Sequence, residues 1–285
     1  MASVSRLFRI AIDGPAASGK SEDKQRTYLL KTCCTCLDIK EKPTTALGTT
    51  AKRLAKRLGF GYLDSGAMYR AVTLKCLEKG IDPNDPKTQD QVSAVAMTAR
   101  IRFPALGKVE LDGQDVSEAI RTSAIVRHIQ PVAANPAVRQ TLANQQRAMA
   151  RGDEKEEEEE DAWPGFVWQS KRVRGVVMDG RDIGTVILPD AELKVFVVAD
   201  PFVRAQRRFA ELQAKEPTIT VEAIARDLVA RDEADRTRLT SPLKKAEDAE
   251  ELDTSHCTID EQVESIEKMV HHRLDRFLKS QQQHQ

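Results

Sequence analysis

The chain has 285 residues, 40% of them hydrophobic, which is enough to bury one large domain or two small ones. Its 44 Lys and Arg balance 44 Asp and Glu, and a net charge of zero argues against a general nucleic-acid-binding protein, which usually carries a basic excess. No stretch approaches the roughly 20 apolar residues of a membrane span, so we expect neither nucleic acid nor a membrane as a partner.

Apolar runs and helical spacing alternate along most of the chain. The runs LFRIAID (7–13), GVVMDGRD and LKVFVVAD are nearly continuous, as is typical of parallel strands buried on both faces. The spacing of apolar residues predicts helices over 48–59, 65–81, 201–215, 220–236 and 258–278. This alternation predicts an α/β fold in which helices flank a parallel sheet.

Two regions interrupt the alternation. Residues 99–117 alternate polar and apolar side chains between turns at Leu106-Gly107 and Asp112-Gly113, which predicts a small antiparallel meander. Helical sequence follows to about Arg151, so we interpret 84–150 as a subdomain inserted in the α/β core. The acidic block at 153–161 is predicted to be a solvated insertion.

A phosphate-binding loop follows the first strand. Gly14, Gly19, Lys20 and Ser21 occur in the order G-x-x-x-x-G-K-S, in which glycines let backbone N–H groups turn toward phosphates. Lys20 would bring a positive charge to the β and γ phosphates, and the following hydroxyl could hold Mg²⁺. The alternative is an ordinary glycine-rich turn.

Charged residues also lie next to other predicted elements. YLDSGAMYR contributes Asp64 and Ser65, which suit a helix N-cap, and Arg70, which is either exposed or directed at an acceptor phosphate. VVMDGRDIGT places Asp179, Arg181 and Asp182 past the carboxyl end of a strand, the edge at which open α/β sheets bind ligands. Asp179 could orient Mg²⁺ through water, and Arg181 could clamp a phosphate. The alternative is a turn whose charged side chains pair with one another and bind no ligand.

Two arginine-rich segments each have two interpretations. ARDEADRTR, with Arg231, Asp235 and Arg238, is either a surface ladder of ion pairs or a closing lid whose arginines reach the transferred phosphate. VRAQRR is either a second basic edge or an exposed helix face, and we expect Arg207 on the exposed face.

Cysteine usage and the first residues favour the cytoplasm. Five cysteines are an odd number without the spacing of a disulfide framework, so free thiols are expected. The cluster Cys33, Cys34 and Cys36 lacks a second pair or a nearby His, which makes zinc the weaker alternative. The opening residues MASVSRLFRIAIDG leave no room for a secretory signal.

Taken together, IAIDGPAASGK, GTTAKRLAKRLGFGYLDSGAMYRAVT, DVSEAIRT, MDGRDIGTVILPDAELKVFVVA and RDEADRTR resemble the bacterial-type cytidylate, or (d)CMP, kinases. The resemblance implies a P-loop nucleoside monophosphate kinase fold, with one domain over 6–279, the acceptor-binding subdomain at 84–150 and a lid at 231–243. It implies phosphoryl transfer from ATP to CMP or dCMP with Mg²⁺, by an enzyme that is a monomer.

The resemblance also implies roles for individual residues. The catalytic residues would be Lys20, Arg181, Arg231 and Arg238. ATP would be bound by Gly14, Pro15, Ala16, Ala17, Ser18, Gly19, Lys20, Ser21, Gly48 and Thr49. CMP would be bound by Asp64, Ser65, Arg70, Arg139 (in NPAVRQ), Arg181, Asp182 and Asp235. The metal would be held by Ser21, Thr49 and Asp179.

The chain departs from the family pattern most clearly in the phosphate loop. The family has G-K-G-T, whereas here 27 residues, 21–47, separate Lys20 from Gly48-Thr49. In one model Ser21 replaces the usual Thr and starts a replacement helix; in the other the insertion loops out between Lys20 and Gly48. The alternatives to an active kinase are therefore a catalytically impaired nucleotide-binding homologue and a kinase for another small acceptor. A smaller departure is Gln130, where the family tends to have a Ser.

Overall fold

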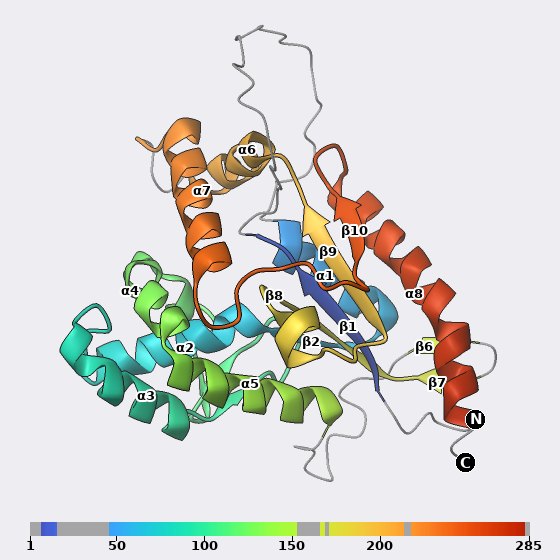
Figure 1. The fold of residues 1–285 in the computed structure, drawn as a ribbon, viewed down its shortest axis with the longest axis horizontal. Coiled ribbons are helices and arrows are strands. Elements are labelled where there is room, and N and C mark those ends of the chain that lie inside the picture. Colours follow the sequence, from blue (N-terminus) through green and yellow to red (C-terminus); the bar gives the residue numbers. More distant parts are fainter. Residues whose placement is uncertain (1–6, 16–45, 153–165, 169–170, 214–217, 283–285) are drawn as a thin grey trace, which may run out of the picture.

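A five-stranded parallel sheet forms the centre of the molecule, in the order β10-β9-β1-β8-β2 (Figure 1). The computed structural model describes residues 7–15, 46–152, 166–168, 171–213 and 218–282. The strands of this sheet are β1 (Phe8–Asp13), β2 (Gly61–Asp64), β8 (Gly175–Gly180), β9 (Leu193–Val198) and β10 (Glu250–Asp253). Because β1, β8 and β9 are buried along their whole length, the prediction of parallel strands from continuous apolar runs is confirmed.

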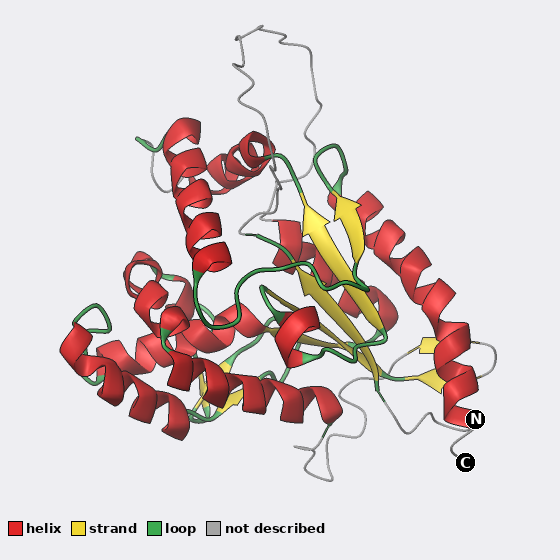
Figure 2. Cartoon of the chain, viewed as in Figure 1, coloured by secondary structure: helices red, strands yellow, loops and turns green. Residues whose placement is uncertain are grey.

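Helices cover both faces of the sheet (Figure 2). On one face, α1 (Ala46–Leu58) and α8 (Ile259–Gln282) pack on alternate residues of β1, namely Phe8, Ile10 and Ile12. On the other face, α2 (Ser65–Glu78) packs on Ala11 and on side chains of β8. The α/β architecture predicted from the sequence is therefore the observed one.

The meander and the helical sequence after it, both predicted, are present between β2 and β8. The meander is β3 (Ile101–Arg102), β4 (Glu110–Leu111) and β5 (Gln114–Asp115), and η2 (Ala119–Arg121), α4 (Ser123–Ala134) and α5 (Pro136–Arg151) follow it. Two elements that were not predicted precede the meander, η1 (Pro86–Thr88) and α3 (Gln89–Thr98). Both predicted turns contain residues with positive φ: Gly107 in the first, and Asp112 and Gly113 in the second. The apolar side chains of this region join those of α2 and β8 in one continuous core.

The helices α6 (Pro201–Leu212) and α7 (Val221–Thr237) form a pair with a small apolar cluster of their own, which includes Ala205, Ile224 and Leu228. A buried ion pair of 2.7 Å between Arg204 and Asp232 joins the two helices. The prediction that Arg207 is exposed is wrong. Its guanidinium donates to the carbonyl oxygens of Thr254 (2.6 Å) and Cys257 (3.3 Å) and ties α6 to the start of α8.

The sequence analysis missed further elements, in the central sheet and beside it. The strand β2 overlaps YLDSGAMYR, where only the start of a helix was predicted. The edge strand β10 has the sequence EELD and is half exposed, so it carries no apolar run. A short hairpin of β6 (Phe166–Trp168) and β7 (Lys171–Val173) precedes β8. A π-helical turn, η3 (Ile183–Ile187), follows β8 inside the DGRDIGT motif.

Within the described ranges, none of the helices combines the length and the apolar character that crossing a membrane requires.

Candidate functional site

The carboxyl ends of β1, β8 and β2 meet at one edge of the sheet. The strand register pairs Asp13 with Gly180 and Asp64 with Asp179, and the N–H of Gly14 donates to the carbonyl of Gly180 at 3.4 Å. The three sequence motifs that contain Asp13, Asp64 and Asp179 therefore lie side by side at this edge. This is the edge at which open α/β sheets bind ligands.

The carboxylate of Asp13 fixes the turn that follows β8. It accepts hydrogen bonds from the backbone N–H groups of Ile183 (2.8 Å) and Gly184 (2.6 Å) in η3. Burial raises the pKa of Asp13 to about 7, although these two hydrogen bonds favour the charged form. The sequence analysis did not single out Asp13; the only signal was a carboxylate that closes an apolar strand.

Replacing Asp13 by Asn is expected to lower the free energy of unfolding by about 1–3 kcal/mol, because one amide oxygen cannot serve two N–H donors and its own NH₂ faces one of them. The loss should be larger at pH 5 than at pH 8. The pKa of Asp13 is about 7 in the folded chain against an ordinary 3.8, so the folded state binds more protons between these values and its stability falls as the pH rises through them.

Urea unfolding of both proteins at about pH 5 and pH 8 measures this difference. A loss that grows with pH would contradict the assignment of the raised pKa to Asp13.

Asp179 occupies the end of β8, beside the first turn of α1. One carboxylate oxygen, Oδ1, is buried and has no hydrogen-bond partner among the described residues. Burial, together with the charge of Asp64, raises the pKa of Asp179 to about 7. Gly48 lies so close that a Cβ there would be 3.6 Å from Asp179 Oδ2.

This surrounding fits a magnesium ion held through water. Mg²⁺ prefers oxygen ligands, keeps several of its waters and usually contacts one or two carboxylates. An unpaired buried carboxylate oxygen next to the turn that carries Thr49 offers such a ligand. Ser21, the third residue predicted to hold the metal, lies outside the described residues.

The start of α2 is held at the same edge. Asp64 caps the helix by accepting from the N–H of Ala67 at 2.8 Å, and its other oxygen accepts from Arg70 at 2.7 Å. The hydroxyl of Ser65 donates to the carbonyl of Asp179 at 2.7 Å. A Cβ on Gly180 would lie only 2.6 Å from that hydroxyl oxygen, so this close approach requires glycine. The N-cap interpretation is thus confirmed for Asp64.

Arg139 reaches the site from α5. The sequence NPAVRQ explains its position, because Asn135 caps the helix by accepting from the N–H groups of Ala137 (3.0 Å) and Val138 (3.1 Å), and Arg139 follows one turn later. Its guanidinium donates to the carboxylate of Asp182 and, at 3.0 Å, to the carbonyl of Ala133. It also lies over the ring of Tyr69, 5.4 Å from the centroid, a contact that the sequence analysis missed.

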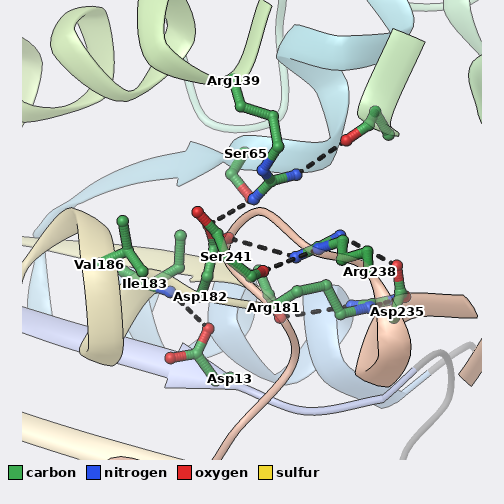
Figure 3. A network of polar contacts seen from close by, with 12 residues as sticks. Asp13, Ser65, Arg139, Arg181, Asp182, Ile183, Val186, Asp235, Arg238 and Ser241 are labelled. Carbon is green, nitrogen blue, oxygen red and sulfur yellow. Dashed lines mark hydrogen bonds and ion pairs between the residues drawn. The ribbon is translucent and has the colours of Figure 1, made fainter. Parts of the chain in front are cut away.

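Figure 3 shows how these groups join into one network. Asp182 lies between Arg139 and Arg238, with 4.0 Å between its Oδ1 and Nη2 of Arg238. Asp235 of α7 accepts from Arg181 at 3.0 Å and from Arg238 at 3.1 Å. Asp235 and Arg238 pair with each other within the segment, but each also has a partner across the site, Arg181 and Asp182 respectively, so a surface ladder alone does not describe them.

The network carries more positive than negative charge. Three guanidinium groups, of Arg139, Arg181 and Arg238, face two carboxylates, of Asp182 and Asp235. Burial and the neighbouring charge of Arg139 lower the pKa of Arg238. A bound anion would stabilise the positive charge of Arg238. Such a group of largely buried arginines suits the phosphates of a nucleotide.

The structure describes some of the remaining predicted site residues but not all of them. Arg231 is exposed on α7, one turn before Asp235, and its charge interacts with Arg181 and Asp235. Gly14, Pro15, Gly48 and Thr49 are described, but Ala16, Ala17, Ser18, Gly19, Lys20 and Ser21 are not. The cysteine cluster of residues 33–36 and the acidic block also lie outside the described residues. In the described part of the chain, no group of three His, Cys, Asp or Glu side chains could hold a metal by itself.

The sheet order places β1, which leads into the glycine loop, between β8 and β9. The network joins Asp13 at the end of β1 to the turn after β8, which carries Arg181 and Asp182 (Figure 3). This arrangement defines the class of the protein, that of the P-loop nucleoside monophosphate kinases.

The comparisons with known proteins assign the family within this class. The family model described as cytidylate kinase matches residues 43–157 and 167–272, more than half of the chain. The cytidylate kinase of Chloroherpeton thalassium is 40% identical over 274 residues, which cover 94% of this chain and 95% of the relative. That of Chlorobaculum tepidum is 41% identical over 264 residues, 92% of each chain. That of Limosilactobacillus reuteri is 39% identical over 268 residues, 92% of this chain and 95% of the relative. The chain belongs to the cytidylate kinase family.

The family match starts inside the chain and is broken once. It begins at residue 43, so the strand β1 and the G-x-x-x-x-G-K segment lie before the matched part. The break between residues 157 and 167 overlaps the acidic block predicted to be an insertion.

Proposed function

We propose that this chain transfers the γ-phosphoryl group of ATP to CMP or dCMP and forms ADP and the corresponding diphosphate. The network of Arg139, Asp182, Arg238, Asp235 and Arg181 at the sheet edge carries the proposal, because it combines buried charge pairs with an excess of arginine. The family to which the chain belongs supports the choice of acceptor.

Arg139 and Asp182 would recognise the acceptor nucleotide. A site that hydrogen-bonds polar edges of its substrate rejects an analogue without them, since its buried polar groups would be left unpaired. Asp235 would face the sugar hydroxyls, and Ser65 and Arg70 would contact the acceptor phosphate. The existing bonds of these side chains restrict their motion before a substrate arrives, which would lower the cost of ordering them.

Lys20, Arg181, Arg231 and Arg238 would stabilise the transferred phosphoryl group. Positive groups placed where charge develops contribute much of the catalysis in phosphoryl transfer. Arg181 and Arg238 are held by Asp235 in this structure, and phosphate oxygens would compete with that carboxylate for the same donors. Arg231 is exposed, so a movement of α7 toward the site would be needed to use it.

The bound metal would be Mg²⁺, held by Thr49 and by Asp179 through water, with Ser21 as a further hydroxyl. When bound, it neutralises charge on the β and γ phosphates of ATP. The active form would be a monomer, as the resemblance to the family implies. The competing proposal remains a nucleotide-binding homologue impaired by the segment 21–47.

An assay of ADP release across nucleoside monophosphates tests the proposed acceptor. We expect turnover that requires Mg²⁺. The kcat/KM for CMP or dCMP should be at least about 100-fold higher than that for UMP or AMP, because the buried pair of Arg139 and Asp182 presents hydrogen-bonding groups in a fixed arrangement. Lys20→Ala should lower the rate by about 100-fold or more, since it removes a charge from the transferred phosphate. Lys279→Ala, at an exposed position near the end of α8, serves as the control and should leave the rate unchanged. Turnover of CMP no faster than that of UMP or AMP would rule out the assignment.

A further inference from the structure

Arg147 lies on α5, about two turns beyond Arg139, which corresponds to about 12 Å along the helix axis. Its guanidinium donates from Nε to the carbonyl of Ile187 at 3.2 Å and from Nη2 to the carbonyl of Val186 at 2.8 Å. Both carbonyls belong to the last residues of η3, the turn that follows β8. Arg147 therefore contacts the same turn as Arg139, but at its other end.

The two residues whose carbonyls Arg147 binds are themselves bonded to Asp182. The N–H groups of Val186 and Ile187 both donate to the carbonyl of Asp182, at 2.9 and 3.1 Å. The carboxylate of Asp182 accepts from Arg139. Asp182 and Val186 are labelled in Figure 3, with Arg139 above them. The helix α5 thus holds η3 at a side chain through Arg139 and at the backbone through Arg147.

The guanidinium of Arg147 serves backbone contacts. Its remaining hydrogen bond goes to the amide oxygen of Asn144, also on α5, at 3.3 Å, and in the described part of the chain Arg147 forms no salt bridge of 4.0 Å or less. The last carbonyls of a helical turn lack partners within the turn and carry partial negative charge. A planar guanidinium presents N–H groups in a fixed fork, which suits two neighbouring carbonyls. The end of η3 is therefore fastened to α5 by a rigid cationic group.

The opposite end of η3 is also fastened. The carboxylate of Asp13 accepts from the N–H groups of Ile183 (2.8 Å) and Gly184 (2.6 Å), which open the turn. Asp13 comes from the sheet, whereas Arg147 comes from the inserted region between β2 and β8. The position of Asp182 relative to Arg139 thus depends on Arg147, because the bonds from Asp13 fix η3 only to the sheet.

We propose that Arg147 is a positioning residue, which ties the end of η3 to α5 and so keeps the carboxylate of Asp182 beside Arg139 for the binding of the acceptor nucleotide. The inference rests on the proposed function for the identity of that nucleotide. It adds a residue that the motifs did not assign, since in the sequence NQQRAMAR nothing distinguishes Arg147 from an ordinary helical arginine.

CMP binding and hydrogen exchange of the full chain test the inference together. Arg147→Met keeps a long apolar side chain and removes the fork. It should weaken CMP binding, measured by calorimetry, by about tenfold, because a hydrogen bond to a charged group is worth about that factor. Affinity for ATP should stay within about twofold. The amides of Val186 and Ile187 should exchange about tenfold faster in the free protein, since the turn that they close is released at one end.

Arg207→Met is the matched control. Arg207 also donates to two carbonyl oxygens, those of Thr254 and Cys257, but it ties α6 to the start of α8. Its loss should lower the melting temperature, as should that of Arg147. It should leave the affinity for CMP within about twofold and the exchange of the η3 amides unchanged.

A double-mutant cycle shows whether Arg147 acts through Asp182. In the Asp182→Asn background, Arg147→Met should weaken CMP binding by no more than about twofold, because the carboxylate that it positions is gone. Nuclear magnetic resonance of the CMP signals measures the weak binding of these two variants.

Unchanged CMP affinity or unchanged η3 exchange in Arg147→Met, an equal loss of affinity in both backgrounds, an equal loss in Arg207→Met, or no CMP binding by the wild-type chain would each overturn the inference. Failure of the proposed function is a separate result: the wild-type chain would bind CMP, and Arg147→Met would weaken that binding, but CMP would not be phosphorylated.

Discussion

Asp182→Asn is expected to lower kcat/KM for CMP by about 100- to 1,000-fold. Asp182 is the buried carboxylate between Arg139, to which it is directly bonded, and Arg238. Removing its charge leaves two buried guanidinium groups without their common partner, and breaking such a pair costs about 3–5 kcal/mol. Only part of that cost adds to the free-energy difference between free enzyme with free CMP and the transition state. This part sets the expected fall in kcat/KM.

The loss should appear mainly as a raised KM for CMP, with a smaller change in the KM for ATP, because Arg139 comes from α5 in the proposed acceptor-binding region. Steady-state rates at varied CMP and at varied ATP separate these effects. The control is Glu192→Gln, which weakens another largely buried pair, with Arg9 at 2.9 Å, at the opposite end of the sheet. It should lower the melting temperature but leave kcat/KM for CMP within about twofold. A similar loss of kcat/KM in both variants would show that Asp182 acts only through stability.

Deleting residues 21–47, which joins Lys20 directly to Gly48, is expected to raise kcat about 100-fold. The deletion restores the order G-K-G-T of the family and makes α1 the direct continuation of the loop. The N-terminus of that helix would hold phosphate by its N–H groups and its dipole. A displacement of about 1 Å in a reacting group can cost about 100-fold in rate. A direct peptide connection between Lys20 and the helix would fix their relative positions, and we therefore expect the deletion to raise the rate.

Single-turnover and steady-state assays of the full chain and the deletion variant measure this gain. Two described residues flank the loop that the deletion would shorten: Gly14 is bonded to Gly180, and Gly48 is beside Asp179. Equal rates would mean that the full chain holds ATP with the insertion looped out. A lower rate in the deletion variant would favour the model in which Ser21 begins a replacement helix.

Sequence pattern alone was sufficient for the three central strands of the sheet, β9, β1 and β8, and for the helices that flank them. The continuous apolar runs of β1, β8 and β9 can only be buried on both faces, and that burial requires helices on either side. The same reasoning failed for β10, whose residues alternate between half-buried and exposed, because an edge strand need not be apolar. The motifs were placed correctly at strand ends, since a polar residue that directly follows a buried strand has to emerge at the sheet edge.

The sequence by itself therefore determined the α/β class, the kinase family and the residue types of the site. Only the tertiary structure decided which of these residues are partners. Arg139 and Asp182 are 43 positions apart, and Asp13 meets Ile183 across 170 positions. Periodicity is a local property, whereas ion pairs depend on which strand ends lie together. The placement of β1 beside β8, and of α5 and α7 over their ends, brings these charges into contact.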